Sequence, residues 1–572
     1  MITRFASPSE PRRAASGGQQ LRDCILLALL IGVVAAPYLR LGYGLDDWDL
    51  LHRISTHDNK PFWRAYREFW HAEPWFRMRP LQSAYHLALY RTFGLDDDWP
   101  HLINLGVYVG GVIGAYGVLL NLGVTRRMAL ATCILFAVFP HFSTDRIWYS
   151  AHFITLSFAC GAAAMYADLR ALDVVSKKAF IGLKTLSILG ISVSILLYEV
   201  TIPLLFLSGL ALWWRSRLLD RGTRRALLSG GANAVLVLAL VGFKAVTSTR
   251  TDAPNGIREL ISRAVRLFGG AALNGYSRNL LELPDSAWRS LTQYGDVTAF
   301  IVAGIAGVMT FAYLVADGGT GRVSVRQTAS YLAIGGAISI FSYAIFIVLP
   351  LPFVKAGSQN RIAIVATMGV ALVVAAAILA LSQSVARYTS LSANIFVATM
   401  TSLLVFGSVA VDVVVTRMAV EAYEKQVSIV SRVSSHMNGN LDGISILVDG
   451  SCQWIGPWPV FETFWDTTGS MRLLTGQRSV RADVVSPILE VHPDGVLMPA
   501  IPGMSDRFVD SRYGYEGLYL YRADTDSLTR LSSEEEARSY FQRESPNALS
   551  PCYGFLGLGT PIFPNLFWGT RL

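Results

Sequence analysis

Long apolar runs separated by short polar segments fill the chain up to about residue 416. An α-helix needs roughly 20 apolar residues to cross a 30 Å hydrocarbon core, and shorter runs fit as tilted or broken helices. The runs lie at about 23–41, 101–122, 128–142, 151–171, 182–198, 200–214, 227–247, 298–316, 329–350, 362–382 and 393–416. This pattern predicts a mainly α-helical, polytopic membrane protein with about eleven transmembrane helices.

The pattern changes after residue 416, where the hydropathy drops. EAYEKQVSIVSRVSSHM is typical of a helix, ISILVDG of a strand, and GLYLYRADTDSLTRL of a hairpin with polar turn residues at ADTDS. We therefore expect three parts: a tail at 1–22, a transmembrane domain at 23–416 with long loops at 42–100 and 248–297, and a small α+β domain at 417–572.

Composition agrees with a membrane protein and narrows the partners. The chain is 52% apolar and 16% charged, with a mean hydropathy of +0.40, which does not suit one soluble core. The net charge of +8 raises the question of nucleic acid, but Lys and Arg lie mostly between the apolar runs. That is the pattern of topology signals and lipid contacts, so we expect no nucleic-acid partner.

The Lys and Arg residues also predict the orientation. With the N-terminus inside, each short cytoplasmic loop is positively charged, through Arg12 and Arg13, Arg126 and Arg127, Arg170, Lys177, Lys178 and Lys184, Arg215, Arg217, Arg221, Arg224 and Arg225, Arg322 and Arg326, and Arg387. The loops 42–100, 140–150, 248–297 and 350–361 and the C-terminal domain then lie outside. We expect an integral protein of a bacterial inner membrane, with a retained first helix, a cytoplasmic N-terminus and a periplasmic C-terminal domain.

Two outside segments predict amphipathic helices at the lipid headgroups. PFWRAYREFWH, at 61–71, places Trp63, Tyr66 and Trp70 on one face, and NGIRELISRAVRLFGG, at 255–270, sets apolar side chains against arginines. The two interpretations are loop anchoring and a wall for a lipid-linked phosphate.

Carboxylates and arginines gather on the same outer side. Asp46 and Asp47 follow the first apolar run in GLDDWDLL, where they would also serve simply as a helix cap. Asp145 and Glu199 are further acids near this side, and ionisable groups at membrane depth are costly unless functional or paired. The basic partners are Arg79, Arg146, Lys355 and Arg361. A carboxylate that takes a proton, beside cations that stabilise a leaving phosphate, suits group transfer from a lipid phosphate to a hydroxyl.

The ordered motifs resemble the polytopic GT-C glycosyltransferases, especially the protein O-mannosyltransferase-like branch. In that family an acidic pair follows the first helix, as in GLDDWDLL, and an Arg-Pro element comes next, as in RMRPL with Arg79. FAVFPHFSTDR is similar to the family's His-Pro…Glu turn, although here Pro precedes His141 and Asp145 replaces Glu. LLYEVTIP with Glu199 and QNRIAIV with Arg361 are similar to two later motifs. The resemblance covers about residues 40–385 and not the C-terminal domain.

The resemblance implies a polyprenyl-phosphate-linked sugar as donor and an acceptor outside the cytoplasm, either a surface glycan, a lipopolysaccharide or a protein, usually with inversion at the anomeric carbon. It implies that Asp46 or Asp47 is the general base and that Asp145 orients the acceptor or shares that role. The implied donor-phosphate residues are Arg79, Arg361 and Lys355, with Glu199, His141 and Arg146 in support. It implies no required metal for a monophosphate donor, although the acids have the chemistry to bind a divalent cation.

Two alternatives and one possible cross-link remain open. A transporter of lipid-linked glycans is disfavoured because its polar residues should run through the membrane, and a polysaccharide polymerase or ligase would use a diphosphate donor. His86, His101 and His141 are weaker candidates for a chemical role.

Cys452 and Cys552 are the two cysteines of the polar C-terminal region. If they pair, a loop of about 100 residues closes, worth roughly 4–5 kcal/mol in the chain-entropy model.

Overall fold

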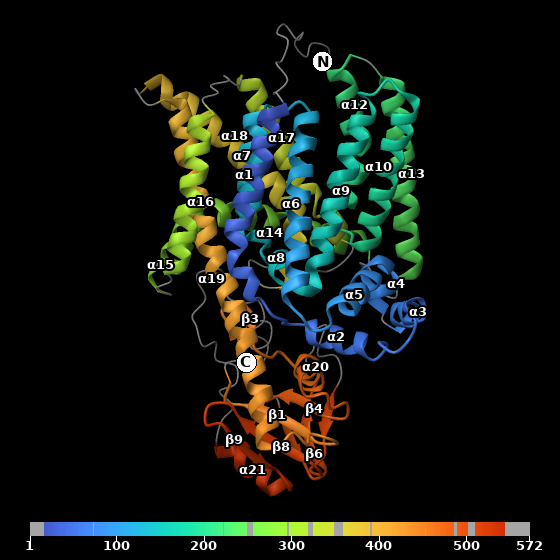
Figure 1. Cartoon of the computed structure of the whole chain (residues 1–572), viewed down its shortest axis with the longest axis vertical. Helices are drawn as coiled ribbons and strands as arrows, with labels where there is room; N and C mark the ends of the chain where they lie inside the picture. The colour runs from blue at the N-terminus through green and yellow to red at the C-terminus, as the bar shows by residue number, and fades with distance from the viewer. Residues whose placement is uncertain are drawn as a thin grey trace.

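In the computed structural model the described residues are 17–72, 74–220, 222–248, 256–293, 297–317, 324–347, 358–388, 392–451, 454–485, 489–500 and 510–543. Within these ranges nine helical segments are long and apolar enough to cross a membrane, and they form one bundle (Figure 1). Their helices are α1 (Gly17–Ala35), α6 (Asp98–Asn121), α9 (His152–Ala171), α10 (Lys177–Leu197), α13 (Thr223–Thr247), α16 (Val297–Ala316), α17 (Val325–Phe341), α18 (Ile364–Tyr388) and α19 (Ala393–His436). The predicted polytopic helical fold is confirmed.

The expected count of eleven spans is not confirmed, because two apolar runs form shorter helices. The run at 128–142 contains α7 (Arg126–Val138), in which every residue from Met128 to Val138 is buried. This helix packs against α1, α18 and α19, so its apolar side chains meet protein rather than lipid. The run at 200–214 is divided between α11 (Ile202–Phe206) and α12 (Ser208–Leu218).

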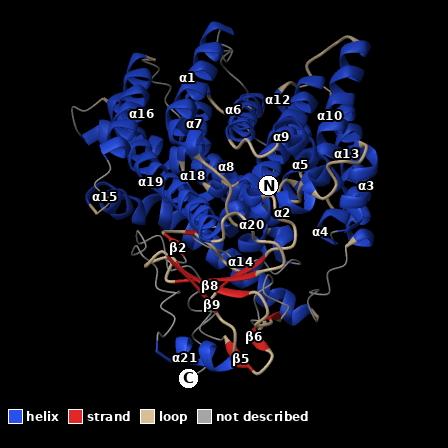
Figure 2. Cartoon of the chain, turned by 60° about the horizontal axis from the view of Figure 1, so that its bottom comes forward, coloured by secondary structure: helices blue, strands red, loops and turns tan. Residues whose placement is uncertain are grey.

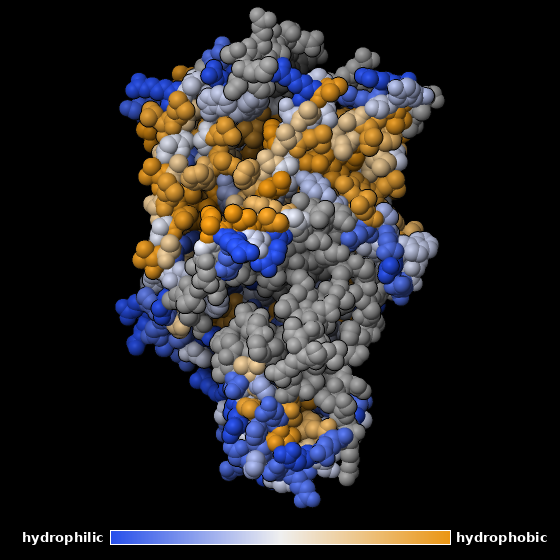
Figure 3. All heavy atoms as spheres, turned by 180° about the vertical axis from the view of Figure 1, so that it is seen from behind, coloured by the Kyte–Doolittle hydropathy of each residue, from blue (hydrophilic) through white to orange (hydrophobic). Residues whose placement is uncertain are grey.

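The bundle surface shows an apolar belt between two polar ends. Figure 3 shows orange side chains around the helices and blue ones at the ends and on the C-terminal domain. Large apolar side chains on α10, α13 and α16 are exposed, among them Leu189, Val235 and Val308. Exposed apolar area on this scale requires a lipid environment, so the chain is a polytopic membrane protein.

Short helices cover one end of the bundle, which we call the loop side. They are α2 (Asp47–Ser55), α3 (Phe62–Ala72), α4 (Pro74–Arg77) and α5 (Pro80–Phe93), and Figure 1 shows them between the bundle and the C-terminal domain. In α3 the Trp63 and Tyr66 rings lie 6.1 Å apart and the Tyr66 and Trp70 rings 5.9 Å apart. The predicted aromatic face of this helix is therefore confirmed. The second amphipathic segment forms α14 (Ile257–Tyr276), on which Ile257 and Ile261 are exposed.

The C-terminal domain is joined to the bundle by one continuous helix. α19 runs for 44 residues, so the predicted boundary at residue 416 falls inside it. The central sheet has the order β4-β1-β8-β9, and Figure 2 shows its strands beyond the helices. These strands are β1 (Ser445–Asp449), β4 (Arg481–Val484), β8 (Leu518–Arg522) and β9 (Ser527–Arg530). The predicted helix, strand and hairpin are all confirmed.

Parallel pairing places a helix across this sheet. β1 is parallel to both β4 and β8, and α20 (Phe464–Thr475) is the crossover between β1 and β4. The remaining elements are the β2 (Trp454–Ile455) and β3 (Trp458–Pro459) hairpin, the sheet of β5 (Glu490–His492), β6 (Gly495–Met498) and β7 (Ser511–Tyr513), and α21 (Glu534–Arg543). Cys452 and Cys552 lie outside the described residues, so their pairing stays a prediction.

Candidate active site

The two adjacent aspartates have different environments. Asp47 begins α2 and is 1% exposed, whereas Asp46 is exposed to solvent. The Gly44 N–H donates to Asp47 Oδ2 at 3.0 Å, and the Ser150 N–H donates to Asp47 Oδ1 at 2.8 Å. The Ser150 hydroxyl donates to the same Oδ1. The sequence left the choice between the aspartates open, and in the structure Asp47 is buried whereas Asp46 is exposed.

The environment of Asp47 suits a group that exchanges protons near neutral pH. Burial raises the pKa of its carboxyl group to about 7, while the hydrogen bonds from Gly44 and Ser150 act in the opposite direction. A general base works best when its pKa lies near the operating pH. Asp47 meets that condition and a solvated aspartate does not.

Asp47 lines a small cavity built from four segments of the chain, one of which is the segment at 147–148. The loop after α1 contributes Tyr43, α19 contributes Tyr423 and Gln426, and the β3 segment contributes Trp458. The cavity has a volume of about 20 Å³, enough for one water-sized group. Its wall is mostly apolar and includes four aromatic residues.

One loop connects Asp47 to an arginine. The segment from η2 (Pro140–Phe142) through α8 (Thr144–Ile147) to η3 (Tyr149–Ala151) carries Trp148, which also lines the cavity. The Arg361 guanidinium lies over the Trp148 ring, 4.9 Å from its centroid. An arginine on an aromatic face is held by cation–π attraction while its edge keeps N–H donors. The same tryptophan therefore contacts Arg361 and lines the cavity of Asp47.

Asp145 lies in the same loop and is completely buried. In the part of the chain that the structure describes, neither of its carboxylate oxygens has a hydrogen-bond partner. Burial raises the pKa of Asp145 well above its usual range, against the opposing charges of Arg361 and Arg146. Its loop is fixed through its backbone, because Asn104 and Thr155 donate to the Asp145 carbonyl at 3.1 and 2.9 Å.

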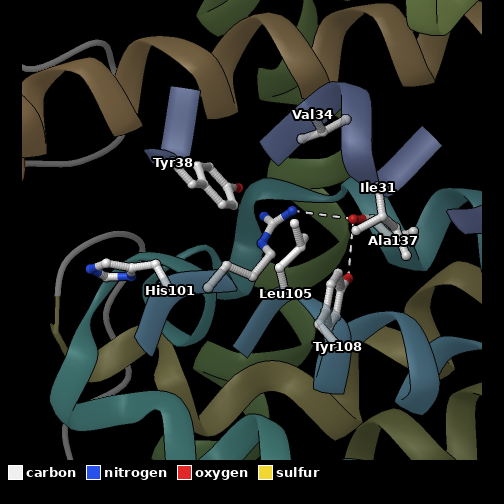
Figure 4. A pocket seen from close by; sticks show the side chains of 8 residues that line it. Ile31, Val34, Tyr38, His101, Leu105, Tyr108 and Ala137 are labelled. Carbon is white, nitrogen blue, oxygen red and sulfur yellow. Dashed lines mark hydrogen bonds between the residues drawn. The ribbon is translucent and has the colours of Figure 1, made fainter. Parts of the chain in front are cut away.

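Arg146 is turned into the protein and fixes the loop. It forms an ion pair of 3.0 Å with Asp412 on α19 and donates to the carbonyls of Ala137 and Phe139. It also lines a second cavity, where Figure 4 shows Tyr38, His101 and Tyr108 and the hydrogen bond from Tyr108 to Ala137. The contacts of Arg146 are those of a packing residue.

A second charged cluster on the loop side joins Arg79, Glu199 and Lys244. Arg79 Nε donates to both Glu199 carboxylate oxygens, at 3.0 and 3.1 Å, and Lys244 Nζ lies 3.0 Å from Oε1. All three side chains are nearly buried, and Arg79 also lies 4.5 Å from the centroid of the Tyr198 ring. Although burial acts to raise it, the two cations lower the pKa of Glu199 to about 2. Two cations share one carboxylate, so this cluster carries a net charge of +1.

Aromatic rings connect the two parts of the site. Tyr198 contacts Phe153 at 5.3 Å, Phe153 contacts His86 at 5.6 Å, and His86 contacts Tyr149 at 5.3 Å between ring centroids. Tyr149 precedes Ser150, the residue that binds Asp47. The structure thus places Asp47, Asp145, Arg361 and the Arg79 cluster on one side of the bundle.

Several predicted residues are not placed. Lys355 and the side chain of His141 lie outside the described residues, so their roles stay predictions. Among the described residues no three His, Cys, Asp or Glu side chains are grouped so that they could hold a metal ion.

Sequence reasoning missed Trp148, Ser150, Lys244 and Trp458. The first two lie in the PHFSTDRIWYS turn, and Lys244 is a single lysine in an apolar run. Trp458 had no signal beyond its aromatic ring.

No family model matches the chain, and no curated protein matches it. Similar solved structures include ArnT from Cupriavidus metallidurans bound to undecaprenyl phosphate, with 13% identity and a TM-score of 0.36 over 81% of this chain and 86% of that one. They also include an Archaeoglobus fulgidus oligosaccharyltransferase tethered with an acceptor peptide, with 13% identity and a TM-score of 0.38 over 81% and 64%.

Proposed function

We propose that this chain is a GT-C-type glycosyltransferase of the bacterial inner membrane. It moves a hexosyl group from a polyprenyl-phosphate donor to a hydroxyl of an acceptor in the periplasm, either a surface glycan, a lipopolysaccharide or a protein. The observation that supports this most is the environment of Asp47, a buried carboxylate with a pKa of about 7 in an aromatic cavity beside Arg361. The N-terminus is cytoplasmic, and the loop side with the C-terminal domain is periplasmic.

The reaction needs one base and one or more fixed cations. The acceptor hydroxyl oxygen attacks the anomeric carbon, its proton passes to Asp47, and the bond from that carbon to the phosphate oxygen breaks. The phosphate leaves with the bonding electrons, and the developing negative charge is stabilised by Arg361. Attack opposite the leaving group inverts the anomeric carbon. Asp145 lies near Arg361 and orients the acceptor in this proposal.

The Arg79 cluster supplies the second cationic group. Its net charge of +1 is nearly buried at the membrane edge, where an unbalanced charge is costly without an anion. A lipid phosphate provides such an anion, and the excess positive charge of Arg79 and Lys244 attracts it. Lys244 joins Arg79, Arg361 and Lys355 as a donor-phosphate residue in this proposal.

The two aspartates provide the test. Asp47→Asn and Asp46→Asn variants, shown to insert normally, are assayed in membranes with a radiolabelled polyprenyl-phosphate hexose and isolated periplasmic acceptor fractions. Asp47→Asn should lower the transfer rate by about 10²–10⁴-fold, the usual contribution of a general base. Asp46→Asn should stay within a few-fold of wild type. Full transfer by Asp47→Asn would refute its role, and a wild-type protein that consumes no lipid-linked sugar would refute the enzyme.

A further inference from the structure

The C-terminal domain forms part of the cavity that contains Asp47. Trp458 and Pro459 of β3 line it opposite segments that belong to the bundle. Trp458 is 4% exposed, so its ring is part of the wall rather than a surface side chain. A cavity that includes this domain is incomplete without it.

The hydrogen-bonding groups around the cavity are mostly occupied. Gln426 accepts from the Trp48 indole at 2.7 Å and donates to the Val460 carbonyl, so both ends of its amide are engaged. Asp47 accepts from Gly44 and Ser150, but a carboxylate offers about four acceptor sites and has capacity left. Asp47 can therefore still accept a proton donor from inside the cavity.

Two tryptophans of the cavity wall, Trp148 and Trp458, have the complementary property. Each has a buried indole nitrogen without a hydrogen-bond partner in the described part of the chain. The Trp148 N–H acts on Asp47 itself and lowers the pKa of its carboxyl group, which leaves the Trp458 N–H for a bound group. An indole N–H can only donate, and buried donors in native proteins are nearly always paired. An oxygen atom that enters the cavity would supply such a partner.

We propose that Trp458 binds the acceptor. A hydroxyl group accepts from the Trp458 N–H and donates its proton to Asp47, and the cavity admits one group of that size. The rings of Tyr43, Trp148 and Tyr423 line the cavity around this hydroxyl. In this proposal the hydroxyl belongs to a carbohydrate acceptor, and the C-terminal domain contributes to its selection. This inference rests on the proposed function.

Trp458→Phe removes the N–H and keeps an aromatic ring. Trp465→Phe is the matched control, because Trp465 has another buried indole nitrogen without a partner in the described residues but does not line the cavity. The full-length variants are assayed with a radiolabelled polyprenyl-phosphate hexose. The acceptor is either the polysaccharide fraction or the protein fraction of periplasm from cells that lack this protein.

Trp458→Phe should raise the KM for the polysaccharide about tenfold, the effect of one lost hydrogen bond, and leave the KM for the donor unchanged. Trp465→Phe should change neither. An unchanged acceptor KM in Trp458→Phe, or an equal rise in both variants, would overturn the role of Trp458. Transfer to the protein fraction alone would overturn the carbohydrate assignment.

A binding experiment separates this inference from the proposed reaction. Equilibrium binding of the polysaccharide fraction is measured without donor for the wild type and both variants. Binding that weakens only in Trp458→Phe supports the subsite even if no sugar is transferred. Binding that is absent in the wild type, or unchanged in Trp458→Phe, refutes the subsite even if transfer occurs.

Discussion

Ser150 donates two hydrogen bonds to one oxygen of Asp47, from its backbone N–H at 2.8 Å and from its hydroxyl. The two residues are 103 positions apart, so this contact fixes the turn after α8 against the start of α2. Because Oδ1 is held by Ser150 and Oδ2 by Gly44, the carboxylate cannot rotate freely. A base with a fixed orientation loses little entropy when it meets its substrate.

The raised pKa of Asp47 predicts an acidic limit to activity. The ordinary value is 3.8 and burial raises it to about 7, so below pH 7 the carboxyl group is mostly protonated and cannot accept a proton. We expect kcat/KM to rise about tenfold per pH unit below that value and to level off above it. The measurement is the initial transfer rate between pH 5 and 8.5, and Asp46→Asn should show the same profile. A flat profile would show that the base is another group.

Ser150→Ala predicts a shift of that profile. The variant removes the hydroxyl donor but keeps the backbone N–H, so the ionised form of Asp47 loses stabilisation and its pKa rises. A lost hydrogen bond to a charged group corresponds to a rise of about one pH unit in the acidic limb. Ser83→Ala is the control, since the Ser83 hydroxyl donates only locally, to Pro80 at 2.9 Å. An unshifted limb in Ser150→Ala would contradict the role of the hydroxyl.

The sequence predicted the parts of this protein that depend on local pattern. Apolar runs of sufficient length predicted the spans, and short apolar segments with polar turn residues predicted β1 and the β8–β9 hairpin, because both signals lie within neighbouring residues. α7 has the same apolar composition as a lipid-facing span, and only the packing around it shows that it is enclosed.

The candidate site depends on contacts between distant segments. Asp46 and Asp47 are chemically identical neighbours, and Asp47 is distinguished by Ser150, whose approach no local pattern encodes. Glu199 stands out in the sequence as an acid between apolar residues, but its partners Arg79 and Lys244 come from other helices. Such pairings follow from the tertiary fold.

Neutralising Lys244 tests the charge of the second cluster. Lys244→Met leaves a one-to-one pair of Arg79 and Glu199 and removes the net positive charge. We expect the KM for the lipid-phosphate donor to rise about tenfold or more, because a nearby cation lost from a buried site weakens phosphate binding. The measurement is the donor KM, with the melting temperature recorded for the same preparation. An unchanged donor KM would remove Lys244 from the donor site.

Glu199→Gln should behave differently from Lys244→Met. It leaves two buried cations without a counter-charge, and breaking a buried pair in this way costs about 3–5 kcal/mol. We expect a marked loss of thermal stability, measured on the detergent-solubilised protein, and a smaller loss in Lys244→Met. If Glu199→Gln were as stable as the wild type, water rather than Glu199 would compensate the charges of Arg79 and Lys244.

Gly469 controls how closely the C-terminal domain approaches Asp47. A Cβ on this α20 residue would lie 2.7 Å from the carbonyl carbon and oxygen of Trp48 and 2.9 Å from the Asp49 nitrogen. These are backbone atoms that cannot swing aside, so Gly469→Ala must push α20 away from α2. Trp48 directly follows Asp47, and the displacement reaches the base.

We expect Gly469→Ala to lower stability by about 1–3 kcal/mol, as overpacked sites do, and to lower kcat for transfer. Gly514→Ala in the same domain is the control, because the nearest atom to its Cβ would be the Asp494 carbonyl oxygen at an ordinary 3.7 Å. Denaturation of the purified proteins and single-turnover transfer rates measure the two effects. Wild-type values of both in Gly469→Ala would mean that α2 keeps Asp47 in place without the C-terminal domain. A loss of kcat with retained stability would show that the close contact positions the base.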